Sequence, residues 1–132
     1  MEIPVTYKQG CVPVTVFQAR GELSAATVQQ LQEEVQRAYA GGTRSLLLDL
    51  SEVSFISSAG LRGIHRTFAF LRSDAPEESD EAVRRGLRAG TFRSSHLKLL
   101  NPSPSALETL RTAGFDLFLE IHSNLKEAVA SF

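Results

Sequence analysis

The stretch that decides the fold is Leu46-Leu47-Leu48-Asp49-Leu50-Ser51-Glu52-Val53-Ser54-Phe55-Ile56-Ser57-Ser58-Ala59-Gly60-Leu61. Its first five residues are largely apolar on both faces, which is typical of a central strand covered from two sides. A polar turn and a second apolar pair follow, and two serines then open a helix. This order predicts a buried strand that delivers a serine hydroxyl to an exposed helix N-terminus, where unpaired N–H groups and partial positive charge favour a phosphate.

Ser57 and Ser58 have two interpretations. Serines at a strand-to-helix junction most often serve as N-caps, in which the hydroxyl accepts a hydrogen bond from a backbone N–H of the first turn. The alternative is a regulatory serine that is switched by phosphorylation. Spacing alone favours the cap.

A resemblance strengthens the regulatory interpretation. The string from Asp49 to Leu61 resembles the signature of the STAS family, the anti-sigma factor antagonists and their relatives. Members typically carry Asp-Leu-Ser-x-Val-x-Phe-Ile-Asp-Ser-Ser-Gly-Leu, and the serine after the last aspartate is phosphorylated; that position is Ser58 here. Gly21-Glu22-Leu23-Ser24 is similar to the family's Gly-Glu-Leu-Asp. Two positions depart from the pattern, because Ser57 and Ser24 stand where the family has aspartate.

The resemblance implies an α/β fold. We expect a single STAS-like domain over residues 1–132, with a mixed, mainly parallel sheet of about four to five strands and helices packed on one side. Periodicity predicts strands at 3–7, 12–17, 46–50, 96–100 and 115–121, and helices at 25–39, after Ser58, at 105–113 and at 125–131. Ser24 is expected to cap the first helix, and Gly41-Gly42 to end it with a left-handed cap. His65 falls on the apolar face of its helix, which predicts a core histidine.

Residues 72–94, called the excursion below, are foreign to the family pattern and are predicted to be an insertion. Loops longer than about 12–15 residues in compact domains tend to be functional or disordered. In a helical conformation Asp80 would pair with Arg84, and Glu81 with Arg85, at the favourable four-residue spacing. We expect a solvated, mobile segment; a dedicated partner surface is the alternative.

Composition excludes several classes of function. At 132 residues, with 42% hydrophobic and 22% charged residues, the chain is typical of one soluble globular domain. A net charge of −1 gives no reason to expect nucleic acid or an anionic membrane as partner. No apolar run approaches the roughly 20 residues that span a bilayer, and the N-terminus lacks signal-peptide features. Cys11 is the single cysteine, so a reducing cytoplasm is expected.

Enzyme signatures are sparse. His65, His96 and His122 are isolated in the sequence, without metal-ligand spacing. Ser58 lacks the glycine two positions earlier that a hydrolase nucleophile elbow requires. We therefore expect a protein that is not an enzyme and that holds no cofactor or metal.

The function that the resemblance implies is partner switching. An unphosphorylated antagonist binds an anti-sigma factor that is also a serine kinase, phosphorylation of the serine releases it, and a phosphatase resets it. In this reading Ser58 is the phosphoacceptor, with Ser57 as a competing acceptor. The residues expected to contact the partner are Glu22, Ser24, Ser57, Ala59, Gly60 and Arg62. The alternatives are a non-phosphorylated STAS module in a scaffold or transporter complex and, with little support, a small-molecule or nucleotide sensor.

Overall fold

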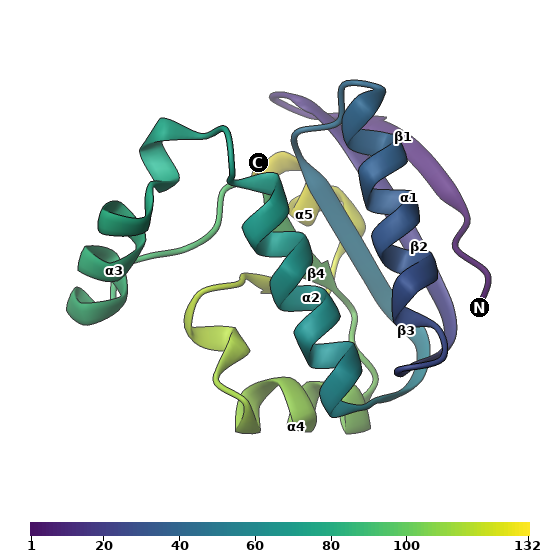
Figure 1. Cartoon of the computed structure of the whole chain (residues 1–132). Coiled ribbons are helices and arrows are strands. Elements are labelled where there is room, and N and C mark those ends of the chain that lie inside the picture. The colour runs from purple at the N-terminus through teal and green to yellow at the C-terminus, as the bar shows by residue number, and fades with distance from the viewer.

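The computed structural model describes all residues from 1 to 132 and contains one five-stranded sheet (Figure 1). The strands are β1 (Val5–Gln9), β2 (Pro13–Leu23), β3 (Leu46–Ile56), β4 (Leu97–Leu100) and β5 (Ile121–His122), and they lie in this order across the sheet. β1 and β2 form an antiparallel hairpin, whereas β2, β3, β4 and β5 pair in parallel. The predicted α/β class with a mixed, mainly parallel sheet is confirmed.

Helices cover the sheet unequally. On one face lie α1 (Val28–Ala40), α2 (Ser58–Leu71) and α4 (Pro104–Thr112), which contribute to the larger apolar core together with Leu46 and Leu48 of β3 (Figure 1). The short α5 (Leu125–Ala130) packs on the other face against a smaller cluster that includes Leu47. Successive side chains of a strand point to opposite faces, so the run of leucines in β3 supplies both clusters. This explains why β3 is apolar on both faces over Leu46, Leu47 and Leu48.

Of three local expectations, two are wrong and one is confirmed. α1 begins at Val28 after Thr27, and Ser24 does not cap it, because the Thr27 hydroxyl accepts the Ser24 N–H at 2.9 Å and donates to the Glu22 carbonyl at 2.7 Å. These bonds hold residues 24–27 in a turn. The left-handed cap at Gly41-Gly42 is confirmed: Gly41 ends α1, Gly42 has a positive φ of +108°, and the N–H groups of Gly42 and Thr43 donate to the carbonyls of Tyr39 and Ala38.

The third concerns residues 115–121, where only β5 is a strand. Phe115–Leu117 form a short 3-10 helix, η2, after Gly114 with its φ of +79°. The Phe115 carbonyl accepts the N–H groups of Phe118 and Leu119 and closes the turn.

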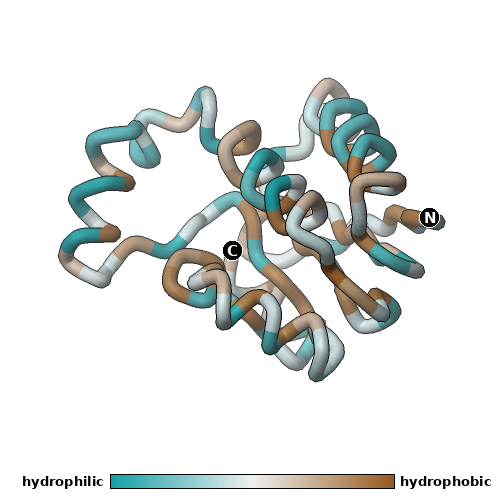
Figure 2. The backbone as a smooth tube through the Cα atoms, turned by 60° about the horizontal axis from the view of Figure 1, so that its bottom comes forward, coloured by the Kyte–Doolittle hydropathy of each residue, from teal (hydrophilic) through white to brown (hydrophobic).

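The excursion has defined secondary structure, with a 3-10 helix η1 (Pro76–Glu78) and the helix α3 (Asp80–Ala89). Ser79 caps α3 through the Ala82 N–H, and Gly90 ends it in the left-handed conformation. α3 stands away from the sheet and is mostly hydrophilic (Figures 1 and 2). The expected pair of Glu81 with Arg85 forms at 2.8 Å.

The other expected pair of the excursion is absent. Asp80 binds Arg72 at 2.9 Å rather than Arg84, because Arg72 reaches over from the end of α2.

Candidate functional site

The C-terminal ends of β2 and β3 bring two loops together at one edge of the sheet. Leu23 pairs with Ile56 at the last position of the β2–β3 ladder. The Ser57 N–H then donates to the Leu23 carbonyl at 2.9 Å, which ties the start of α2 to the turn at residues 24–27. The site is therefore built on paired strands rather than on free loops.

The two serines at this junction have different environments. Ser57 is the N-cap of α2 in an extended conformation, and its half-buried Oγ accepts the Gly60 N–H at 3.1 Å. Ser58 is the first residue of the helix; it is exposed, and its hydroxyl makes no hydrogen bond within the chain. The capping and the regulatory interpretations thus fall on neighbouring residues: Ser57 is the cap, and Ser58 carries the free hydroxyl.

Gly60 is required by the packing of the chain itself. It is buried, and a Cβ at this position would lie 2.3 Å from the Leu23 carbonyl oxygen and 3.1 Å from Cγ2 of Ile56. We expected Gly60 to admit the backbone of a partner. The backbone that approaches Gly60 within the chain is that of β2, and a contact of Gly60 with a partner stays a prediction.

The remaining predicted residues surround Ser58 with different degrees of exposure. Glu22 is exposed, Ser24 and Ala59 are half-buried, and the hydroxyl of Ser24 makes no hydrogen bond. Arg62 is exposed one helical turn after Ser58 and has no ion-pair partner in the chain. The structure therefore brings the turn at residues 22–24 and the first turn of α2 to the same edge of the sheet.

An open groove of about 460 Å³, called the Ser58 groove below, runs along α2 from this serine. Its lining consists of Ser58, Leu61, Arg62, His65, Arg66 and Phe115. His65 is exposed there rather than in the core as predicted, and its ring packs edge-on against Phe68 and Phe118. α2 contains two arginines and no acidic residue, so the groove is lined by basic side chains together with the aromatic rings of His65 and Phe115.

Sequence reasoning missed most of this groove. Arg66 was visible as an exposed helix residue, but Phe115 comes from η2, far along the chain, and no local pattern pairs it with α2. A sequence motif can indicate Ser58; the opposite wall of the groove depends on the tertiary fold.

The side chains with shifted pKa values lie outside the Ser58 groove. A hydrogen bond to Asp74 raises the pKa of the Tyr39 hydroxyl. Burial tends to raise the pKa of Glu120, but the hydrogen bond and charge of Lys98 outweigh it, and that pKa is lowered. No group of three or more His, Cys, Asp or Glu side chains is arranged to hold a metal ion. None of the helices is both long and apolar enough to cross a bilayer.

Comparison with known proteins identifies the family. Residues 3–75 match the STAS domain. Osmosensory protein A of Mycobacterium tuberculosis is 49% identical over 47 residues, which make up 36% of this chain and 29% of that protein. The matched segment thus spans less than a third of that relative.

Solved structures with the same fold cover nearly the whole chain. A protein of Thermotoga maritima, described as a candidate anti-sigma factor antagonist, has a TM-score of 0.71 and 19% identity over 96% of this chain and 90% of its own. The Bacillus anti-sigma factor antagonist SpoIIAA has TM-scores of 0.65 unphosphorylated and 0.61 phosphorylated. Both of its forms are 18% identical and match 96% of this chain, with 93% and 96% of their own length covered.

Proposed function

Because this chain belongs to the STAS domain family, we propose that it is an anti-sigma factor antagonist that works by partner switching. Unphosphorylated, it binds an anti-sigma factor that is also a serine kinase; phosphorylation of Ser58 releases it, and a phosphatase restores binding. The observation that carries the proposal is the exposed, unbonded Ser58 hydroxyl on the first residue of α2. In this account the protein acts in the cytoplasm and catalyses nothing itself, because the kinase supplies the ATP chemistry.

The geometry favours Ser58 over Ser57 as the acceptor. A kinase must reach the hydroxyl oxygen, and that of Ser57 is half-buried and engaged with the Gly60 N–H. Ser58 has neither obstacle.

The charge of the Ser58 groove indicates the chemistry of the partner. Arg62 and Arg66 face solvent without ion-pair partners, beside the apolar surface of Leu61 and Phe115. We propose that the bound kinase places acidic side chains against the arginines and an apolar anchor over Phe115. Glu22 and Ser24 form the rim on the side of β2.

Phosphorylation would act through this same surface. A phosphate adds about −1.5 to −2 charges, which repel an acidic partner and compete with it for Arg62. The N-terminus of α2 tolerates the added charge, so the fold of the antagonist is retained. A change of about 2.7 kcal/mol in binding free energy weakens affinity roughly a hundredfold, which is sufficient for release.

One feature favours a second candidate function. Ser24 and Ser57 stand at positions where members of the STAS family typically carry aspartate. Two carboxylates that a kinase would contact are therefore missing from this chain. A STAS module that binds constitutively within a scaffold or transporter complex would need neither carboxylate.

Phosphate mapping separates the two. The protein is incubated with ATP and a candidate anti-sigma kinase, and the masses of the intact protein and of its peptides are then measured. Ser58→Ala is treated in the same way, with Ser54→Ala at an exposed position of β3 as the control. We expect one added phosphate on Ser58, absent only from Ser58→Ala. If a kinase that modifies its known substrate leaves this protein unmodified, partner switching with that kinase is excluded and constitutive binding takes first place.

A further inference from the structure

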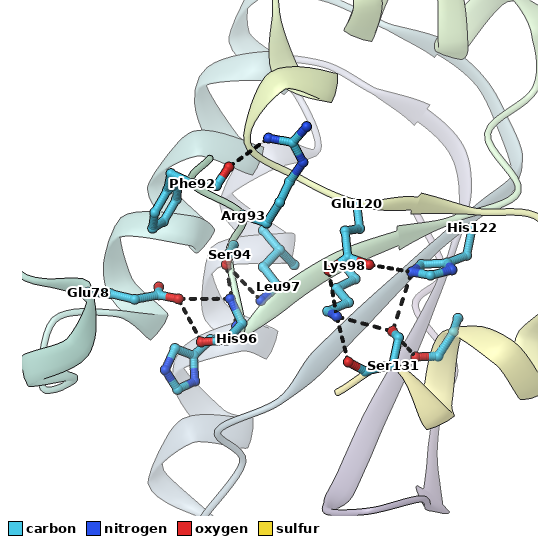
Figure 3. A network of polar contacts seen from close by, with 12 residues as sticks. Glu78, Phe92, Arg93, Ser94, His96, Leu97, Lys98, Glu120, His122 and Ser131 are labelled. Atoms are coloured by element: carbon cyan, nitrogen blue, oxygen red, sulfur yellow. Dashed lines mark hydrogen bonds and ion pairs between the residues drawn. The ribbon is translucent and has the colours of Figure 1, made fainter. Parts of the chain in front are cut away.

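The base of the excursion is fastened by a buried carboxylate. Glu78 in η1 is 3% exposed, and its Oε2 accepts both the N–H of Ser95 at 2.8 Å and its hydroxyl at 2.6 Å (Figure 3). Arg72, at the end of α2, donates to the Glu78 carbonyl at 2.8 Å. The segment that leaves α2 is thereby tied to the residues that enter β4.

His96 forms a second fastening beside the first. Its Nδ1 lies 2.9 Å from the Arg44 carbonyl oxygen, and its Nε2 lies 3.0 Å from Oε1 of Glu77. Both partners only accept hydrogen bonds, and a neutral imidazole has a single N–H to donate. The two contacts are therefore satisfied together only when both ring nitrogens carry a proton.

The charges around this ring support its doubly protonated form. The nearest are the carboxylate of Glu77 and, through the adjoining Ser95, that of Glu78. The neighbouring cations are engaged elsewhere: the Arg44 guanidinium lies over the Tyr39 ring, and Arg72 binds η1 and Asp80. The Tyr39 hydroxyl donates to Asp74. A hydrogen bond from its own backbone and one from His96 lower the pKa of Glu77, so this side chain is ionised except in acid.

We propose that His96 and Glu77 form a pH-sensitive clasp that holds the excursion against the sheet. The clasp is closed while both ring nitrogens carry a proton, and it opens when the ring loses one of them, because only one of the two acceptors then has a donor. The Glu77 side chain is 60% exposed and turns to water once its donor is lost. α3 itself buries only Val83, and the contact of Asp80 with Arg72 holds its first residue.

Hydrogen exchange of residues 76–89 tests the clasp. Protection factors, which remove the intrinsic effect of pH on exchange, are measured at about pH 5.5 and about pH 8. We expect roughly fivefold lower protection at the higher pH, since the contact between His96 and Glu77 is then lost. The ¹⁵N signals of the His96 ring should show both nitrogens protonated at the lower pH.

Two variants and a control decide the cause. Glu77→Gln should abolish the pH difference, because its amide can donate to a neutral ring or accept from a charged one. His96→Gln should abolish it as well, whereas His122→Gln, which alters the contact of His122 with Glu120, should keep it. Equal protection at both pH values in the unaltered protein, or a difference that persists in Glu77→Gln, would overturn the proposal.

Discussion

At the scale of single residues, Ser57 has a structural role, and its neighbour Ser58 is the serine for which we propose a regulatory one. Ser57 satisfies a backbone N–H of α2, and Ser58 satisfies nothing in the chain. A short motif can indicate that a serine lies at this junction, but only the position of each Oγ relative to the first turn distinguishes the two. The proposed switch therefore leaves the stabilising cap untouched.

This division predicts different costs of substitution. Ser57→Ala should lower the free energy of unfolding by about 1 kcal/mol, since the Gly60 N–H loses its acceptor. Ser58→Ala should change it by no more than about 0.5 kcal/mol, as at other exposed positions. Urea denaturation measures both; a larger loss for Ser58→Ala would show that its hydroxyl has a structural partner.

Gly60 gives a second prediction at this scale. Gly60→Ala should cost about 2 kcal/mol or more, because the added methyl would lie 2.3 Å from the Leu23 carbonyl oxygen and must push β2 and α2 apart. Gly41→Ala is the matched control, since its Cβ would lie 3.4 Å from the nearest atom. Similar midpoints for the two variants in thermal melts would contradict the close approach.

At the scale of elements, the sequence predicts best where local and tertiary preferences agree. α2 forms as its helical stripe predicts, whereas β3 continues from the apolar run through the predicted polar turn as far as Ile56. The start of α1 could not be predicted, because it depends on the bonds that the Thr27 side chain makes across a turn. The Ser58 groove could not be predicted either, because Phe115 of η2 is distant from α2 in the sequence and lies beside it only in the folded chain.

The attachment of α5 rests on a buried charge. Lys98 is 3% exposed, and its Nζ donates to Glu120 at 2.8 Å and to the carbonyl oxygen of Ser131 at 2.8 Å (Figure 3). The lysine thus joins β4 to the residue before β5 and to the end of α5. Lys98→Met should cost about 2–3 kcal/mol, as expected for hydrogen bonds of a charged group.

The same contact predicts a dependence on pH. The pKa of Glu120 is lower in the folded chain than the 4.5 of an unfolded glutamate. The contribution of the pair is therefore complete above that value and is lost as the pH falls through the folded pKa. The melting temperature should fall less on acidification in Lys98→Met than in the unaltered protein, with exposed Lys126→Met as the control. Parallel curves for all three would contradict this role of Lys98.

At the scale of the whole molecule, the proposed switch changes a surface and leaves the fold alone. The Ser58 groove lies on one face of α2, and the excursion leaves that helix at its opposite end. The proposed phosphorylation of Ser58 and the proposed clasp of His96 with Glu77 thus lie apart, the first at the start of α2 and the second beyond its end. The family match ends at residue 75, within the excursion, and the insertion at residues 72–94 stays a prediction.

The most direct test compares binding of the anti-sigma kinase to the two forms of this protein. Isothermal titration is performed with unphosphorylated protein and with protein phosphorylated on Ser58, using a kinase that cannot turn over ATP. The account predicts that the phosphate raises Kd about a hundredfold or more, and that Arg62→Ala weakens binding of the unphosphorylated form. Equal Kd values for the two forms would contradict partner switching at Ser58.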